Sequence, residues 1–496
     1  MSNPSGSQAR EETANKKPVF CCSFFQCRCG SHYFPQRIIL ALLLHLFMQN
    51  NFTTRVVLNV AIVEMVQPPP EETAHLQACP QFNAPNKTHE GGKFPWPAHT
   101  KSLVLYAFYI GYTFTQVPGG WLADKFGARP VILSSIACTT LATALFPVMT
   151  QKFGYLAAVG LRFMVGTSHG FCMPALSSLV STWFPPKERP IWGGLAYAGT
   201  NLGTIMGNII SGFLIHKFDG WPVAFYFWSA YSGLFFLLVL LLLFSFPDTH
   251  PYISKAEADY IRMENCKTGN RTVVGRSFKT PWKAILLNGP YWANIAGQFG
   301  HNYIYLSLVT YLPTYMREIL QFDVANDGYF AAIPFVALWI MSLIYSTTAP
   351  LIIKCTSERA FNSVLGAGSN VASAAIVLGA VYAACNRQLC IGLYIFSMII
   401  KAFYYATLPV NINGLSRNYG GIMFGLCNAL GSVSGIIGNF IIGALTKHKQ
   451  LHEWRLAFWI TFGVCVVTTV IFFLFSSTER QKFDYNEEEL AEMQNS

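Results

Sequence analysis

Twelve long apolar runs, separated by short polar segments, constrain the fold of this chain more than any other feature. Most of these runs exceed the roughly 20 residues that an α-helix needs to cross the hydrocarbon core of a bilayer. Only 12% of the residues are charged, about half the share that a soluble domain carries. We therefore expect an all-α membrane protein with twelve transmembrane helices. The predicted spans are 37–64, 100–122, 130–149, 154–182, 191–215, 221–246, 289–314, 328–353, 361–384, 389–411, 420–445 and 454–476.

The basic residues indicate the orientation of the chain in the membrane. The net charge of +10 is high enough for a nucleic-acid binder, but the lysines and arginines fall mostly in short segments between the apolar runs. Positive charge in alternate short loops marks the cytoplasmic side of a membrane protein. We therefore expect a lipid bilayer and no nucleic acid as a partner, and both termini in the cytoplasm. The residues behind this prediction are Lys16, Lys17, Arg28, Arg37, Lys125, Arg129, Lys187, Arg189, Arg480 and Lys482.

The longest charged interruption divides the spans into two blocks of six. Two six-helix blocks joined by a charged cytoplasmic linker are typical of transporters built from two homologous halves. The predicted organisation is a cytoplasmic tail (1–36), a first six-helix bundle (37–246), a cytoplasmic linker (247–288), a second six-helix bundle (289–476) and a cytoplasmic tail (477–496).

Two modification signals lie between and before the spans. The loop 65–99 contains Asn86-Lys87-Thr88, a glycosylation sequon that only a lumenal or extracellular loop can use. The charge pattern places this loop on that side, so we expect Asn86 to be glycosylated. Four cysteines beside the first span are candidates for palmitoylation because they are predicted to be cytoplasmic and close to the membrane. They are Cys21, Cys22, Cys27 and Cys29. The alternative is a redox-inert cluster or a weak metal site, although no ordered His/Cys spacing follows them, so we expect palmitoylation and no metal.

The segment 111–129 reads GYTFTQVPGGWLADKFGAR and carries the most distinctive motif in the chain. Its last part places Asp124 and Lys125 at a helix end, followed by Gly127 and Arg129. An acid and two cations around a tight glycine turn can latch neighbouring helices in one access state. This Asp–basic–x–Gly–x–Arg pattern resembles the cytoplasmic loop signature of the major facilitator superfamily.

The longer string G-Y-x-x-T-Q-x-P-G-G-x-L-A resembles one family of that superfamily, which includes sialin, vesicular glutamate transporters and type I sodium–phosphate cotransporters. The resemblance implies the major facilitator fold with pseudo-symmetric six-plus-six halves, and a secondary active carrier of small anions that works by alternating access. No catalytic constellation stands outside the spans, so we expect neither enzymatic activity nor a cofactor. Further segments that support the resemblance are 174–175, 183–189, 220–222, 247–254 and 312–315.

Arg55, in the first span, bears most directly on the substrate. A cation within a span costs roughly 2.5–3.5 kcal/mol on insertion scales, so it normally faces a cavity or a counter-charge. The resemblance implies an arginine here that contacts the substrate anion, although Val57 replaces the Asn of the family pattern. A guanidinium binds carboxylate or phosphate through two parallel hydrogen bonds. We expect Arg55 to bind the anion; the alternative is an interfacial arginine that reaches the lipid headgroups.

Arg162, in the fourth span, lies seven residues before His169. The resemblance implies a glutamate at position 169 that couples proton movement to transport, and this chain lacks it. Imidazole titrates in the range of a buried carboxylate but gains positive charge when it is protonated. His169 therefore has three open roles: proton coupling, anion binding, or a hydrogen bond to a neighbouring helix. We expect Arg162 to bind the anion, with a structural arginine bound to backbone carbonyls as the alternative.

Lys401 lies in the middle of the tenth span, which contains no acidic residue to neutralise it. Together with the two arginines it predicts a cavity that strongly attracts anions. The alternative is that the span is shifted and the lysine reaches the membrane interface. This prediction rests on the residues and owes nothing to the family pattern.

The seventh span offers polar side chains where vesicular glutamate transporters have a further arginine. Gly300 stands at the matching place, and it precedes the candidate cavity-lining residues His301, Asn302 and Tyr305. This stretch looks more like the phosphate-cotransporter branch, and the missing arginine counts against glutamate as substrate.

Three departures from the family pattern leave gating and coupling open. Gly414 replaces an Asp and Arg417 a Pro after the tenth span, and Pro350 replaces the Asp of a second latch. The expected substrate is inorganic phosphate or a small organic anion, with sodium as the coupling ion and a proton as the alternative. A lysosomal or vesicular carrier of acidic sugars or amino-acid anions stays open, and so does a non-transporting anion sensor. We expect a monomeric carrier in the plasma membrane or in an endolysosomal or vesicular membrane.

Overall fold

The computed structural model describes residues 35–66, 94–218, 220–266, 280–319, 324–383, 386–416, 418–446 and 450–485. Helices occupy all twelve predicted spans, as expected for an all-α membrane protein. The first six spans are α1 (Gln36–Met65), α2 (Ala98–Phe126), α3 (Ala128–Phe153), α4 with α5 (Tyr155–Gly170 and Cys172–Trp183), α6 (Arg189–Lys217) and α7 (Pro222–Leu242). The last six are α10 (Gly289–Glu318), α11 (Val324–Cys355), α12 with η2 and α13 (Glu358–Ala360, Phe361–Ala367 and Gly368–Tyr382), α14 with η3 and α15 (Arg387–Lys401, Ala402–Ala406 and Leu408–Leu415), α16 (Gly420–Leu445) and α17 (Leu451–Phe475).

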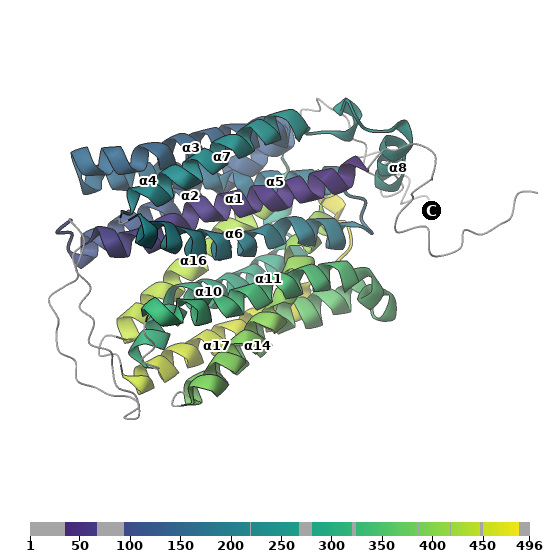
Figure 1. The fold of residues 1–496 in the computed structure, drawn as a ribbon. Coiled ribbons are helices and arrows are strands. Elements are labelled where there is room, and N and C mark those ends of the chain that lie inside the picture. Colours follow the sequence, from purple (N-terminus) through teal and green to yellow (C-terminus); the bar gives the residue numbers. More distant parts are fainter. Residues whose placement is uncertain are drawn as a thin grey trace, which may run out of the picture.

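The helices form two bundles that follow the order of the sequence. In Figure 1 the first six spans, drawn in purple to teal, lie together above the last six, drawn in green to yellow. The helix α8 (Lys255–Cys266) lies at one end of the bundles, on the side where the chain leaves its last span. We call this end the linker face, and we call the opposite end, where α1 ends and α2 begins, the loop face.

Seven of the described helical segments are long and apolar enough to cross a membrane by length and composition alone. The spans outside that group include α1, α2, α6 and α10, which carry polar side chains in their interiors. In a membrane bundle, polar side chains are expensive unless they face the interior or a water-filled cavity. These helices are therefore the ones expected to surround a solute pathway.

Helix α8 docks on the linker face through two carboxylates. Glu257 accepts hydrogen bonds from the backbone N–H groups of Gln36 (2.9 Å) and Arg37 (3.1 Å), which begin α1. The free N–H groups at a helix N-terminus favour such a partner. The Tyr260 hydroxyl of α8 donates to Glu188, just before α6, at 2.9 Å. The linker thus ties together the starts of α1 and α6.

The segment after α17 returns to the turn between α15 and α16. Asp484 is 2% exposed and pairs with Arg480 at 2.6 Å. Its carboxylate also accepts hydrogen bonds from the Ser416 hydroxyl (2.6 Å) and the Asn418 backbone N–H (3.0 Å). This is the turn in which Gly414 replaces the acid of the family pattern. The C-terminal segment therefore supplies a carboxylate to the same turn.

Candidate functional site

Asp124 joins the two bundles at the linker face. Its carboxylate accepts hydrogen bonds from the backbone N–H groups of Gly421 (3.2 Å) and Ile422 (2.9 Å), in the first turn of α16. The N–H groups there have no partner within the helix, and the helix N-terminus is partly positive. A Cβ atom at Gly421 would lie 2.6 Å from Asp124 Oδ1, so the contact requires glycine.

The other residues of the predicted latch stay within the first bundle. Gly127 ends α2 with φ of +87°, a conformation that favours glycine. The Arg129 guanidinium donates to the carbonyl oxygen of Leu240, near the end of α7, at 2.8 Å. The Lys125 ammonium lies 4.6 Å from the ring centroid of Trp121. Asp124 therefore contacts the second bundle, while Lys125 and Arg129 contact residues of the first bundle.

Asn413 of α15 makes a second connection between the bundles at this face. Its side-chain oxygen accepts a hydrogen bond from the Ser177 hydroxyl (2.9 Å), and its backbone carbonyl accepts one from Arg189 Nη1 (2.9 Å). Arg189 is buried and also donates to the carbonyl oxygen of Ser181 at 2.8 Å. Together with the Asp124 contacts, these bonds close the linker face in this structure.

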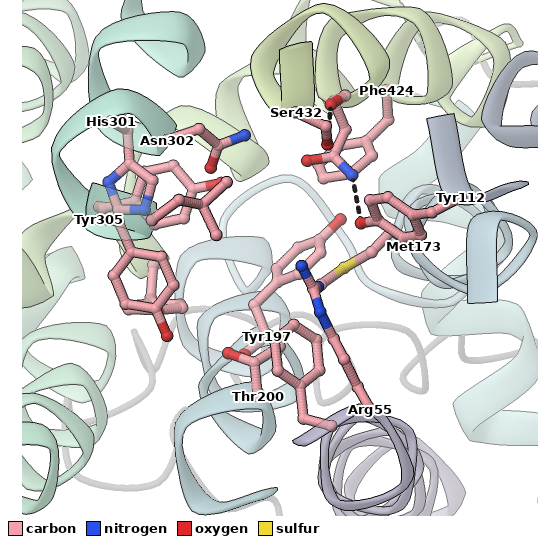
Figure 2. Close-up of a pocket in the computed structure, with 15 residues that line it drawn as sticks. Arg55, Tyr112, Met173, Tyr197, Thr200, His301, Asn302, Tyr305, Phe424 and Ser432 are labelled. Carbon is pink, nitrogen blue, oxygen red and sulfur yellow. Dashed lines mark hydrogen bonds between the residues drawn. The ribbon is translucent and has the colours of Figure 1, made fainter. Parts of the chain in front are cut away.

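A cavity of about 590 Å³ lies between the two bundles. Figure 2 shows Arg55 reaching into it from α1, while His301, Asn302 and Tyr305 of α10 lie on the opposite side. Seven of the fifteen lining residues are Phe or Tyr, and none of the fifteen is acidic. The lining residues are Phe52, Arg55, Tyr112, Met173, Tyr197, Thr200, His301, Asn302, Tyr305, Leu306, Tyr404, Tyr405, Phe424, Asn428 and Ser432.

Arg55 is surrounded by aromatic rings. Its guanidinium carbon lies 5.0 Å from the ring centroids of Phe52 and Phe108, and 5.1 and 5.3 Å from those of Tyr109 and Tyr112. Ring faces attract a cation, but they do not replace an anion that accepts hydrogen bonds. Among the described residues, no carboxylate forms a salt bridge with Arg55. The cavity therefore contains a guanidinium without a protein counter-ion.

Arg162 and His169 lie behind Arg55 and do not line the cavity. Arg162 Nη2 donates to the backbone carbonyl of Arg55 at 3.2 Å, and its guanidinium carbon lies 5.0 Å from the Phe108 centroid. His169 Nε2 is 3.3 Å from the Thr54 hydroxyl, and its ring meets Phe108 edge-on at 5.4 Å. The structure thus brings the three predicted residues together around Phe108, and Arg55 is the one that reaches the cavity.

Lys401 is fully buried at the end of α14 and also lies outside the cavity wall. Its ammonium donates to Asn370 Oδ1 at 3.3 Å. The Asn370 side chain also lies beside the ring of His301, and that ring stacks on Tyr404 with 3.3 Å between centroids. Lys401 therefore contacts Asn370 and interacts with His301, and His301 is the member of this group that lines the cavity.

Position 300 does not face the cavity. A Cβ atom on Gly300 would lie 2.2 Å from the Thr468 hydroxyl oxygen of α17. No larger side chain fits there without displacing that helix, whereas His301 points into the cavity. The missing arginine of this span is therefore tied to how α10 packs.

An amide network that crosses between the bundles was missed by the sequence reasoning. Asn428 Nδ2 donates to the Tyr112 hydroxyl (2.8 Å) and to Gln116 Oε1 (2.7 Å), both of α2. Gln298 Nε2 donates to Asn428 Oδ1 at 3.2 Å, and the Tyr404 hydroxyl donates to Gln298 Oε1 at 2.9 Å. The available signal was the presence of these amides within apolar runs, where they form hydrogen bonds between helices.

Some predicted sites lie outside the described residues, and these are Asn86, Cys21, Cys22, Cys27, Cys29 and Arg417. Within the described part of the chain, no group of three or more His, Cys, Asp or Glu side chains is arranged to hold a metal ion. Pro350 lies inside α11.

The family follows from comparison with known proteins. The family model described as Major Facilitator Superfamily matches residues 33–413. The chain belongs to this superfamily. It is a multi-pass membrane transport protein that acts on a small-molecule substrate, and it is not an enzyme.

Curated relatives bear out the resemblance found in the motifs. Human sialin is 29% identical over 446 residues, which cover 88% of each chain. A Drosophila melanogaster protein named "Putative inorganic phosphate cotransporter" is 28% identical over 471 residues, or 92% of this chain and 88% of the relative. Vesicular glutamate transporter 3 of Danio rerio is 28% identical over 458 residues, or 91% of this chain and 75% of the relative.

Solved structures confirm the fold class. The proton:xylose symporter superposes with a TM-score of 0.65 at 11% identity, covering 90% of this chain and 97% of the other. The fucose:proton symporter of E. coli gives a TM-score of 0.58 at 14% identity, covering 88% and 99%. At these identities the likeness concerns the fold alone.

Proposed function

We propose that this protein is a secondary active carrier of small organic anions, with its substrate site at Arg55. The observation that carries the proposal is a guanidinium in a cavity of about 590 Å³ whose lining residues include no acid. A buried cation normally has a counter-charge, and here the substrate would supply it. The names of the relatives, which include a phosphate cotransporter and glutamate transporters, support an anion as the substrate class.

An organic anion fits the cavity better than inorganic phosphate. Five tyrosines and two phenylalanines in the wall offer ring faces and edges to a flat or apolar substrate body. A phosphate ion on Arg55 would leave most of these rings without a partner. Phosphate, acidic sugars and amino-acid anions are the alternatives that the uptake panel below distinguishes.

Alternating access would proceed by rocking of the two bundles about the cavity. We place the linker face, with both termini, in the cytoplasm, because the basic segments gather there and the Asn86 loop joins α1 to α2 at the other face. The closed state described above would then receive the anion from the loop face. We propose a monomeric carrier in the plasma membrane or an endolysosomal membrane. Sodium is the coupling ion that the phosphate branch would imply, and the surroundings of Lys401 support a proton instead.

The test is uptake into proteoliposomes that contain the purified full-length protein. Radiolabelled benzenesulfonate, phosphate, glutamate and N-acetylneuraminate are compared, with sodium and pH varied separately. We expect benzenesulfonate to exchange fastest. Arg55→Ala should lower its exchange rate by roughly 30- to 150-fold, because one charged bidentate contact contributes about 2–3 kcal/mol. The exposed Arg359 gives a matched control, since Arg359→Ala removes the same charge away from the cavity.

If Arg55→Ala retains exchange at the wild-type rate, the anion does not bind at Arg55 and this cavity is not its site. Anion binding by the wild type without any exchange or uptake would instead favour a non-transporting sensor. If phosphate exchanges fastest, the protein is still a carrier, but its substrate is inorganic phosphate and not an organic anion.

A further inference from the structure

Lys401 has surroundings unlike those of the other cations near the cavity. Its ammonium is fully buried and donates a hydrogen bond to the neutral oxygen of Asn370 at 3.3 Å. In the described residues no acidic side chain pairs with it. Burying an ammonium with so little compensation is costly, and the neutral amine is the form that such a site tolerates when nothing else is charged.

The titratable and hydrogen-bonding groups that interact with Lys401 in the described part of the chain come from three neighbouring elements, and none of them is a carboxylate. Helix α13 presents Asn370, and α10 presents His301. Helix α17 presents the thiol of Cys465. Tyr404 of η3 stacks on the far partner of this group, His301. An anion in the cavity would therefore be the negative charge that balances the ammonium.

We propose that Lys401 carries the coupling proton of transport. It is protonated while an anion occupies the cavity, and it returns to the neutral amine when the cavity is empty. This inference rests on the proposed function, because it needs the anion. Binding of the anion and binding of the proton then favour each other by the same free energy, since such coupling is reciprocal.

The proton balance is simple. An anion and one proton enter from the loop face, and the Lys401 amine takes up the proton. After the bundles rock, the anion leaves toward the linker face, and the ammonium releases its proton to the same side. His301, which lines the cavity and faces Lys401, has two ring nitrogens through which the proton can pass. One proton therefore moves with each anion.

The same geometry argues against sodium. A sodium ion bound among oxygen ligands brings a positive charge that a carboxylate commonly balances, and the lining residues include no acid. When the anion is bound, the protonated Lys401 already supplies a cation beside the cavity. We therefore expect transport to be independent of sodium.

The experiment separates exchange from accumulation in proteoliposomes that contain the full-length protein. Exchange of labelled for unlabelled benzenesulfonate, which is permanently ionised and does not cross the bilayer as a neutral acid, involves the loaded carrier alone. Accumulation also needs the empty carrier to return. Phosphate and N-acetylneuraminate are run in parallel. The variants are Lys401→Met and Lys401→Arg, with Lys217→Met as the control because Lys217 is exposed at the end of α6.

We expect an acid-outside gradient to drive accumulation by the wild type and by Lys217→Met, up to about tenfold per pH unit, with or without sodium. Lys401→Met should keep exchange, with weaker affinity, and lose accumulation. Lys401→Arg should also keep exchange and lose accumulation, because a guanidinium holds its proton.

Accumulation at the wild-type level in Lys401→Met would overturn the proposal, and so would wild-type accumulation that requires sodium and ignores pH. Loss of pH-driven accumulation in His301→Gln but not in Lys401→Met would assign the proton to the histidine instead. If both Lys401 variants lose exchange, the residue is structural and the proposal is wrong. Wild-type protein that exchanges none of the anions would refute the proposed function itself.

Discussion

The contact between Asp124 and the start of α16 gives a prediction whose size follows from the structure. Asp124→Asn keeps one side-chain acceptor but removes the charge and the second acceptor oxygen. The wild-type carboxylate accepts two backbone N–H bonds, at 3.2 and 2.9 Å. A hydrogen bond to a charged group contributes about 1.5–3 kcal/mol, and a charge at a helix N-terminus adds about 0.3–1 kcal/mol. Because these bonds join the two bundles, the loss should fall on the state closed at the linker face. We expect that state to lose about 2 kcal/mol, a shift of roughly 30-fold toward the state open there.

The assay is labelling of a cysteine placed at the closed linker face. Ser181 is buried there, and a Cβ atom on Gly420 of the other bundle would lie 3.5 Å from its hydroxyl oxygen. In Ser181→Cys, a membrane-impermeant maleimide added from the linker side reports how often the face opens. Asp124→Asn in this background should raise the labelling rate about 30-fold.

Two comparisons make the labelling result specific. Gly421→Ala should also raise the rate, because its Cβ atom would displace Asp124 Oδ1. The control Asp248→Asn removes a carboxylate that pairs with Arg262 inside the linker, so it should leave the rate unchanged. An unchanged or lower rate in Asp124→Asn, measured against protein without the added cysteine, would refute the argument that this contact holds the linker face closed.

Two other contacts near the linker face give further predictions. Asp484→Asn should lower the free energy of unfolding of the detergent-solubilised protein by about 3–5 kcal/mol, because it leaves the buried guanidinium of Arg480 without its carboxylate. Thermal denaturation measures this loss, and the control Glu479→Gln, at an exposed position, should change the stability little. Burial lowers the pKa of His250 in the linker, and its Nδ1 accepts the backbone N–H of Tyr252 at 3.2 Å, so protonation removes that bond. The neutral form is the folded form, so hydrogen-exchange protection of the Tyr252 amide should be constant above the ordinary histidine pKa of about 6.5 and fall below it, by about fivefold for a lost bond of about 1 kcal/mol. His250→Phe should remove the pH dependence, and an unchanged acid response in that variant would assign it to another group.

Most of what could be predicted came from the lengths of the apolar runs and from single charged residues within or beside them. The twelve apolar runs predict twelve helical segments because a span must satisfy its own backbone and be long enough to cross the membrane. Arg55 could be assigned to a cavity because an isolated cation within a span has few other places to be. Asp124 could be predicted to latch a neighbouring helix. Its partners could not be named, because they are backbone N–H groups nearly 300 residues away, which no side-chain pattern marks.

The position of Lys401 shows why other features of the site could not be predicted from the sequence. Its place near the middle of an apolar run suggested a cavity-facing cation. In the structure α14 ends at Lys401 and the chain continues as the short helix Ala402–Ala406, which turns the tyrosines toward the cavity and leaves the lysine behind them. A change of helix type within a span alters which face each residue presents, and hydropathy does not record it. The burial of Asp484 could not be predicted for a similar reason, since nothing in a polar C-terminal segment indicates that one of its acids is buried.

Each of the two bundles places positively charged or titratable side chains near the cavity. In the first bundle, two guanidiniums and the ring of His169 all lie close to Phe108, and position 169 is where the family pattern has a proton-carrying glutamate. A histidine close to two fixed cations is a poor place to add a further positive charge, because the neighbouring charges repel it. In the second bundle, Lys401 is buried next to His301, which lines a cavity whose occupant is expected to be negative. Loss of the glutamate therefore does not require loss of proton coupling, because the second bundle contains a residue able to take over that role.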